Sequence, residues 1–310
     1  MIKNATFSIT NRCNSRCKVC NIWKHNDFSN ELSLSQIEKL FENPYFKELD
    51  TLSITGGEPF LRTDLIQIIQ LIKRQLPKVN RIFLNTNGTL VDKVLSLSNM
   101  CVSLFPETIL SISLDGSEQV NNKLRGINNY NNVLSLIEKA SKINGLRISL
   151  SMTISKDNCV YSELQHVHNI AKKYNAMFSF RFADISETYY KNADIDLSVS
   201  NSDKQIVSKY IKENGLDKDF LSVLKEYIDT KQVPFLIDKH GNNHCLAGKE
   251  FVFIHPDGTV CPCLYSKQKI NIGSDKKEKI ELGKSEKCPC CTDCAIYPIL
   301  EYKRKLAKEK

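Results

Sequence analysis

Apolar and polar residues follow two different periods along roughly the first 185 residues. Apolar residues spaced three or four apart, such as Leu65, Ile68, Ile69 and Ile72, indicate helices, whereas shorter alternating segments indicate strands. The predicted strands are 4–10, 51–55, 80–85, 109–114, 146–154 and 176–182, and the predicted helices are 33–43, 62–75, 90–98, 130–143 and 160–174. Strand–helix alternation of this kind predicts an α/β fold with a parallel sheet.

The predicted strands have one apolar face and one face of small polar residues. Buried parallel strands are usually apolar throughout, and a packed barrel is filled by bulky branched side chains. The polar face contains Thr6, Ser8, Thr10, Ser53, Thr55, Ser111, Ser113, Asp115, Ser149, Ser151, Thr153, Ser179 and Arg181. We therefore expect an open barrel that holds a polar ligand. An antiparallel sheet with one solvated face would alternate similarly, although the intervening helices argue against it.

The character of the chain changes twice after the last predicted strand. Residues 186–240 are polar and helical in pattern, and from 241 onward the chain changes to a segment marked by Gly, Pro and seven cysteines. We predict a barrel over residues 1–185, a helical linker over 186–240, and a small cysteine-rich, metal-held domain over 241–310.

Composition excludes several classes of protein. With 310 residues, 41% hydrophobic and 25% charged, the chain is typical of a globular protein. It has neither an apolar run of membrane-spanning length nor an N-terminal signal sequence, so we expect a cytoplasmic protein without a membrane partner. The net charge of +8 comes from scattered lysines, and no basic stripe with interleaved aromatic residues predicts nucleic-acid binding.

Twelve cysteines are the most informative feature of the composition. In a reducing cytosol they indicate metal binding or catalysis rather than disulfides. Cys13, Cys17 and Cys20 form a C-x3-C-x2-C pattern directly after the first predicted strand. Three thiolates in one loop can bind three irons of a 4Fe-4S cubane and leave the fourth iron open to a ligand. A zinc site completed by His25 or by a distant residue is the alternative.

Further polar motifs stand at the ends of the next strands. Gly-Gly-Glu-Pro at 56–59 combines two glycines, which permit close backbone approach, with a carboxylate that can receive an amino group. Asn85 and Asn87 stand at the end of the third strand, Ser113 and Asp115 at the end of the fourth, and Leu-Arg-Gly at 124–126 comes after the fourth. Plain turns would explain the Gly-Gly, Asn-Gly and Asp-Gly pairs equally well.

The three-cysteine loop followed by Gly-Gly-Glu-Pro resembles the radical S-adenosylmethionine (SAM) superfamily. The resemblance covers the first 185 residues and implies a partial (β/α)6 TIM barrel with a 4Fe-4S cluster on Cys13, Cys17 and Cys20. It further implies that SAM binds the fourth iron and is cleaved by one electron to a 5′-deoxyadenosyl radical, which abstracts a substrate hydrogen atom. The SAM-binding residues that it implies are Gly56, Gly57, Glu58, Pro59, Asn85, Asn87, Ser113, Asp115 and Arg125. Val19 departs from the aromatic residue frequent before the third cysteine, which puts its contact with adenine in doubt.

A second cysteine cluster lies between residues 245 and 294. Asp257-Gly258 predicts a hairpin turn between 251–254 and 259–260, beside cysteines that suit a metal site. The segment resembles the SPASM and twitch auxiliary-cluster domains of radical SAM enzymes. The shorter twitch form implies one auxiliary 4Fe-4S cluster, bound by Cys245, Cys263, Cys291 and Cys294. Cys261, Cys288 and Cys290 have no assigned role in this ligand set. A shifted ligand pair, a second cluster and a zinc knuckle therefore stay open as alternatives.

The resemblance predicts a radical SAM enzyme that acts on a peptide or small molecule in natural-product tailoring, by oxidation, crosslinking or epimerisation. A sugar or aminoglycoside-type dehydrogenase or epimerase is an alternative, and a zinc-stapled binding protein is the alternative from another class. Cys159 and Cys261 are candidate hydrogen-atom donors, although a buried cysteine is often simply a small apolar residue. Arg181 could bind a carboxylate, whereas His166 and His168 are predicted to lie on the surface.

The same resemblance implies partners. An external electron donor such as flavodoxin or ferredoxin would reduce the cluster. Many peptide-modifying relatives carry a leader-binding domain before the barrel, and here the first strand begins near residue 4. We therefore expect a small-molecule substrate or a separately encoded peptide-recognition protein.

Overall fold

The computed structural model describes residues 2–25, 27–215 and 247–270. Its strands are β1 (Asn4–Ser8), β2 (Thr51–Thr55), β3 (Arg81–Thr86), β4 (Glu107–Ser113), β5 (Leu146–Ile154), β6 (Met177–Phe182), β7 (Phe251–Ile254) and β8 (Val260–Cys261). Its α-helices are α1 (Leu34–Glu42), α2 (Leu65–Gln75), α3 (Val91–Leu104), α4 (Glu118–Arg125), α5 (Tyr130–Ala140), α6 (Tyr161–Lys173) and α7 (Asn201–Glu213). Single 3-10 turns span Ile22–Lys24, Pro44–Phe46 and Pro59–Leu61.

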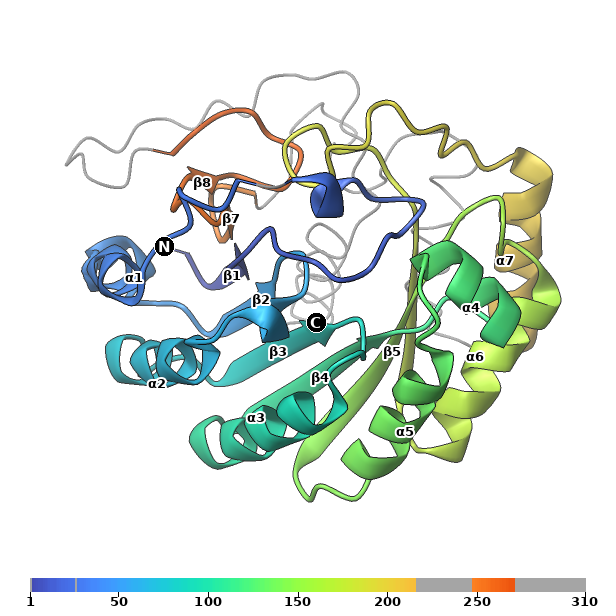
Figure 1. Ribbon diagram of the computed structural model, residues 1–310, viewed down its shortest axis with the longest axis horizontal. Coiled ribbons are helices and arrows are strands. Elements are labelled where there is room, and N and C mark those ends of the chain that lie inside the picture. The colour runs from blue at the N-terminus through green and yellow to red at the C-terminus, as the bar shows by residue number, and fades with distance from the viewer. Residues whose placement is uncertain (1, 26, 216–246, 271–310) are drawn as a thin grey trace, which may run out of the picture.

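The strands form one sheet in the order β6-β5-β4-β3-β2-β1-β7-β8. The first six strands are parallel neighbours in chain order, and helices cover the convex side of the curved sheet (Figure 1). This is the predicted partial (β/α)6 barrel. The predicted hairpin is also present, because β7 and β8 pair antiparallel with Ile254 opposite Val260. The hairpin joins the barrel sheet through parallel pairing of β7 with β1, so this part of the 241–310 segment continues the barrel.

The hydrophobic core lies between the convex face of the sheet and the helices. Ile112 of β4 and Leu150 of β5 are fully buried there, as are Ile68 and Ile72 on one face of α2. Burying side chains of this size stabilises the fold by about 1.5–3 kcal/mol each. Local capping also fixes where a helix begins. Ser33 and Gln36 form a capping box at the start of α1.

Three local expectations were wrong. Helix α3 continues to Leu104, beyond the predicted end at residue 98, so Cys101 lies inside this helix and is buried. Residues 186–200 contain no helix, and the first helix of the predicted linker is α7. His168 is not on the surface, because its ring is stacked on Phe178 and its Nδ1 lies 2.7 Å from the Tyr210 hydroxyl.

No helix in the part of the chain that the structure describes is long and apolar enough to cross a membrane.

Candidate active site

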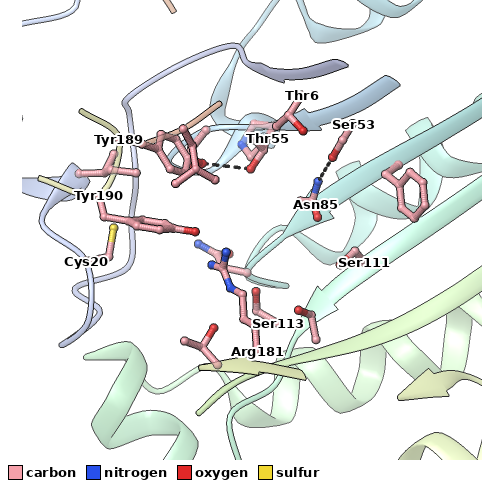
Figure 2. A pocket seen from close by; sticks show the side chains of 18 of the residues that line it. Thr6, Cys20, Ser53, Thr55, Asn85, Ser111, Ser113, Arg181, Tyr189 and Tyr190 are labelled. Carbon is pink, nitrogen blue, oxygen red and sulfur yellow. Dashed lines mark hydrogen bonds between the residues drawn. The ribbon is translucent and has the colours of Figure 1, made fainter. Parts of the chain in front are cut away.

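A cavity of about 360 Å³ occupies the concave side of the sheet. Small polar side chains line it, as the alternation along the strands predicts, and Figure 2 shows Thr6, Ser53, Asn85, Ser111 and Ser113 around it. Of the predicted polar face, Ser8, Thr10 and Asp115 alone do not reach the lining that the structure describes. Arg81 and Phe83 of β3 and Phe251 and Phe253 of β7 also line the cavity and were not predicted.

The three-cysteine loop closes the carboxyl end of the cavity, and Cys13, Cys17 and Cys20 all line it. Burial raises the pKa of Cys13 to about 11 and that of Cys20 to about 12. Burial also raises the pKa of Cys17, while the guanidinium of Arg125, 4.0 Å from its sulfur, opposes the rise. Such thiols become thiolates only when a cation compensates for the lost hydration.

Gly56 and Gly57 hold this loop from one side. The Gly57 N–H donates to the Thr10 carbonyl at 2.8 Å, and the Glu58 N–H donates to the Arg12 carbonyl at 2.7 Å. A Cβ on either glycine would lie 2.3 Å from a backbone oxygen of residues 10–12, so no larger residue fits. The glycines were predicted to allow close approach to a ligand, and their closest partner in the structure is the backbone of the cysteine loop.

The Leu-Arg-Gly stretch at the end of α4 holds the loop from the other side. The N–H groups of Arg16 and Lys18 donate to the carbonyls of Arg125 and Leu124, both at 2.9 Å. Gly126 ends the helix with φ +64°, and a Cβ there would lie 2.4 Å from the Arg16 carbonyl oxygen. The motif thus positions the cysteine loop through the backbone as well as through the arginine side chain.

Asn87 and Glu58 connect the loop to the end of β3. The Asn87 amide donates to Asn14 Oδ1 at 2.8 Å and to Ser15 Oγ at 2.9 Å. The Glu58 carboxylate accepts from the backbone N–H groups of Asn87 and Phe60 and from the Thr86 hydroxyl. Burial raises the pKa of Glu58 to about 7, although these three hydrogen bonds oppose the rise.

The predicted SAM-binding residues divide into two groups. The cavity is lined by Gly56, Gly57, Pro59, Asn85, Asn87, Ser113 and Arg125. Glu58 and Asp115 do not line it. The Asp115 carboxylate accepts from the Thr153 N–H at 2.8 Å and lies 2.7 Å from Arg125 Nε. Their geometry favours a positioning role, and direct contact of Glu58 or Asp115 with SAM stays a prediction.

Segment 183–195, which is neither helix nor strand, is a part of the site that the sequence did not predict. Tyr189 is buried and donates from its hydroxyl to the Gly56 carbonyl at 3.0 Å. The Tyr190 carbonyl accepts from the Asn21 N–H at 2.9 Å, and the Asn192 amide donates to the Val19 carbonyl at 2.8 Å. No periodicity or motif marks these residues, because they act through backbone contacts with a distant loop.

The same segment contacts the C-terminal hairpin. The Ser186 and Thr188 hydroxyls both donate to the Leu264 carbonyl at 2.6 Å, and the Tyr189 ring packs 4.9 Å from that of Phe253. Cys261 and Cys263 are buried in the hairpin region and do not line the cavity. Cys245, Cys288, Cys290, Cys291 and Cys294 lie outside the described residues, so the auxiliary ligand set stays a prediction.

The two predicted hydrogen-atom donors lie away from the cavity. Cys159 is 1% exposed in the hydrophobic core, and its thiol lies 3.2 Å from the Asp203 carbonyl oxygen on α7. Burial raises its pKa to about 12. Cys261 is 3% exposed on β8. Since a donor must reach the substrate, this geometry does not support either residue in that role.

The cysteine loop has the donor set of an iron–sulfur cubane. Cys13, Cys17 and Cys20 all line the same cavity, and each thiolate of a cubane binds a different iron. Arg125 beside Cys17 also suits an anionic cluster.

Comparison with known proteins agrees with this chemistry. The radical SAM superfamily matches residues 7–158, and SPASM, an iron–sulfur cluster-binding domain, matches residues 245–287. A probable GTP 3',8-cyclase of Methanococcus maripaludis is 27% identical over 270 residues, which cover 85% of each chain. AlbA, an antilisterial bacteriocin subtilosin biosynthesis protein of Bacillus subtilis, is 23% identical over 278 residues, which cover 87% of this chain and 57% of AlbA.

Solved structures show the same fold. SuiB of Streptococcus suis bound to S-adenosylmethionine has a TM-score of 0.65 at 16% identity, covering 89% of this chain and 64% of SuiB. The protein anSMEcpe with bound AdoMet and the Kp18Cys peptide has a TM-score of 0.61 at 16% identity, covering 92% of this chain and 81% of that one. The chain therefore belongs to the radical SAM superfamily and is an enzyme with a C-terminal SPASM iron–sulfur cluster-binding domain, whose cofactors are SAM and iron–sulfur clusters.

Proposed function

We propose that this enzyme abstracts a hydrogen atom from a peptide or an amino-acid-like molecule, in the tailoring of a natural product. The observation that carries the proposal is the charge of the cavity. Its charged lining residues, among those that the structure describes, are Arg81, Arg125, Arg181 and Asp184. Arg125 is ion-paired with Asp115, Arg81 shares Glu107 with Arg147, and Asp184 interacts electrostatically with Arg181, so carboxylates in and behind the described wall offset much of the arginine charge.

This charge balance favours a nearly neutral substrate over a nucleoside triphosphate. A triphosphate needs several cations to replace its hydration. The described lining supplies hydroxyl and amide groups instead, together with the rings of Phe83, Tyr189, Tyr190 and Phe253. Such walls suit peptide amides and side chains. The names of two relatives are consistent with a peptide, since SuiB has been solved bound to the precursor peptide SuiA and AlbA serves subtilosin biosynthesis.

When bound, a 4Fe-4S cluster with SAM supplies the one-electron cleavage that generates a hydrogen-abstracting 5′-deoxyadenosyl radical. Cys13, Cys17 and Cys20 would hold that cluster. Arg125, Ser113 and the backbone of Gly56 and Gly57 line the space beside it, where they can bind the polar groups of SAM. The sheet and the cysteine loop form walls of the cavity, and these walls limit the access of water to a reactive species.

The test uses the full chain, reconstituted with iron and sulfide under anaerobic conditions and reduced with dithionite. A pool of short peptides from deuterated cells is added with SAM, and 5′-deoxyadenosine is analysed by mass spectrometry. We expect deuterium to enter 5′-deoxyadenosine from a fraction of the pool, whereas GTP should not increase its formation. Stimulation by GTP, with no transfer from any peptide fraction, would contradict the proposal.

A matched pair of cysteine variants serves as the control. Cys17→Ala removes a thiol of the loop and should abolish 5′-deoxyadenosine formation. Cys101→Ala removes a thiol buried in α3, away from the cavity, and should leave the turnover per cluster unchanged. An auxiliary cluster bound by Cys245, Cys263, Cys291 and Cys294, and reduction by flavodoxin or ferredoxin, are further parts of the proposal.

A further inference from the structure

We propose that Arg181, backed by the ring of Tyr190, forms a subsite for one carboxylate group of the substrate. The inference rests on the proposed function, which it narrows to peptides or amino-acid-like molecules that carry a carboxylate near the reacting carbon. It assigns a binding role to a residue that lies outside both the cysteine loop and the Gly-Gly-Glu-Pro motif.

The position of Arg181 puts its charge inside the cavity. The residue lies on β6, in register with Thr153 of β5, and its side chain points to the polar, concave side of the sheet. Figure 2 shows the guanidinium group in the middle of the cavity, between Tyr190 and Ser113. Hydroxyl groups of Ser113, Ser179 and Thr153 line the same wall and can add hydrogen bonds to a bound anion.

The surroundings of the guanidinium restrict its motion. Its Cζ lies 5.2 Å from the centre of the Tyr190 ring, in a cation–π contact. The Tyr190 ring packs 4.8 Å from that of Tyr189, and the Tyr189 hydroxyl is hydrogen-bonded to the Gly56 carbonyl. An arginine that is held in this way loses less conformational entropy on binding than a free one.

The subsite lies next to the cysteine loop. The Asn21 N–H, directly after Cys20, donates to the Tyr190 carbonyl at 2.9 Å. Cys20 and Tyr190 also pack against the same small hydrophobic cluster, formed by Ile22, Tyr189, Phe253 and Leu264. A carboxylate on Arg181 would therefore fix the substrate close to the loop that generates the radical.

A carboxylate fits this subsite better than a phosphate chain. The planar guanidinium fork matches two carboxylate oxygens, and one such pair neutralises one charge. Arg125 and Arg81 are already ion-paired with Asp115 and Glu107, and Asp184 interacts electrostatically with Arg181, so the lining that the structure describes has little further positive charge for a larger anion.

The experiment measures binding of two matched probes to the full protein by saturation-transfer NMR. The first probe is N-acetylglycine, which has a carboxylate, and the second is N-acetylglycinamide, which does not. Inorganic phosphate is added as a competitor in a separate arm. The variants are Arg181→Gln, Arg181→Lys and, as a surface control, Arg74→Gln on α2, whose side chain is 63% exposed. SAM binding and the formation of 5′-deoxyadenosine without substrate are measured for each variant.

We expect the acid to bind more tightly than the amide, and Arg181→Gln to weaken the acid by about 10- to 100-fold, as the loss of a charge-assisted pair predicts. Arg181→Lys should retain part of the affinity, Arg74→Gln all of it, and SAM binding should not change. The proposed subsite is overturned if the acid and the amide bind equally, or if Arg181→Gln binds the acid as tightly as the wild type does. Loss of SAM binding in both Arg181 variants also overturns it, since Arg181 would then serve SAM. Displacement of the acid by equimolar phosphate would overturn the preference for a carboxylate.

These outcomes separate the inference from the function on which it rests. If the wild-type protein forms no 5′-deoxyadenosine, the proposed function fails whatever the probes show. If it forms 5′-deoxyadenosine and takes deuterium from peptides, but does not distinguish acid from amide, the carboxylate subsite alone fails.

Discussion

The two faces of the barrel sheet use the same strands for different purposes. On the convex face of β4 and β5, Ile112 and Leu150 are fully buried against helices. One residue away along each strand, Ser111 and Ser151 line the cavity. The convex face contributes the stability of the fold, and the concave face provides binding groups that contribute little to it. Because side chains alternate along a strand, neighbouring residues of one strand serve either the stability of the fold or the binding cavity.

Leu150→Ala should give the largest effect on the convex face. Removing a fully buried leucine side chain leaves a cavity in the core, which we expect to lower the free energy of unfolding by about 2–5 kcal/mol. Urea unfolding followed by circular dichroism measures it. The matched concave-face variant is Ser151→Ala, and equal losses in the two variants would contradict the separation.

Gly126→Ala should disturb the contact between the end of α4 and the cysteine loop. The new Cβ would lie 2.4 Å from the Arg16 carbonyl oxygen, on a residue whose φ is +64°. We expect a loss of about 1–3 kcal/mol in stability and a lower iron content after reconstitution. Gly215→Ala is the control, because Gly215 has φ +63° with nothing within 4 Å of its Cβ position. If both variants lose iron equally, backbone strain rather than contact with the loop is the cause.

His168 should make the convex face sensitive to pH. Burial lowers its pKa below the ordinary value, with a smaller contribution from Lys172, so the unfolded chain binds a proton that the folded chain does not. Stability from this group is complete above the ordinary histidine pKa of about 6.5 and is lost as the pH falls through the lower folded value. Urea titrations between about pH 7.5 and 5 should show a flatter profile for His168→Gln than for wild type, by less than the Leu150→Ala effect. If the stability profiles of His168→Gln and the wild type run parallel, groups other than His168 cause the pH dependence.

Ser111→Ala should give the smallest change in stability, within about 0.5 kcal/mol, because its side chain faces the cavity. Its expected effect is on the substrate, seen as a higher KM in the peptide assay. A loss of more than about 1 kcal/mol would mean that the concave face supports the fold after all.

Much of the fold and of the metal loop could be predicted from the chain alone. The six strands and five of the helices were predicted because their periodicity is local. Helix α4 was missed, since among its eight residues only Asn121 and Leu124 are buried. The extended end of α3 was missed because Ser98 and Ser103 obscure the apolar pattern near its C-terminus.

The sequence by itself determined the chemistry of the site. Three closely spaced cysteines, Gly-Gly-Glu-Pro and the polar strand faces are local patterns, and each one states what kind of group it can bind. The tertiary structure decided which of the predicted site residues face that group and which do not. It placed Glu58 and Asp115 behind the wall and Cys159 in the core, and it brought Tyr189, Tyr190 and Arg181 to the cysteine loop. The physical reason is that a side chain's role depends on burial and on partners distant in the chain, which no local pattern encodes.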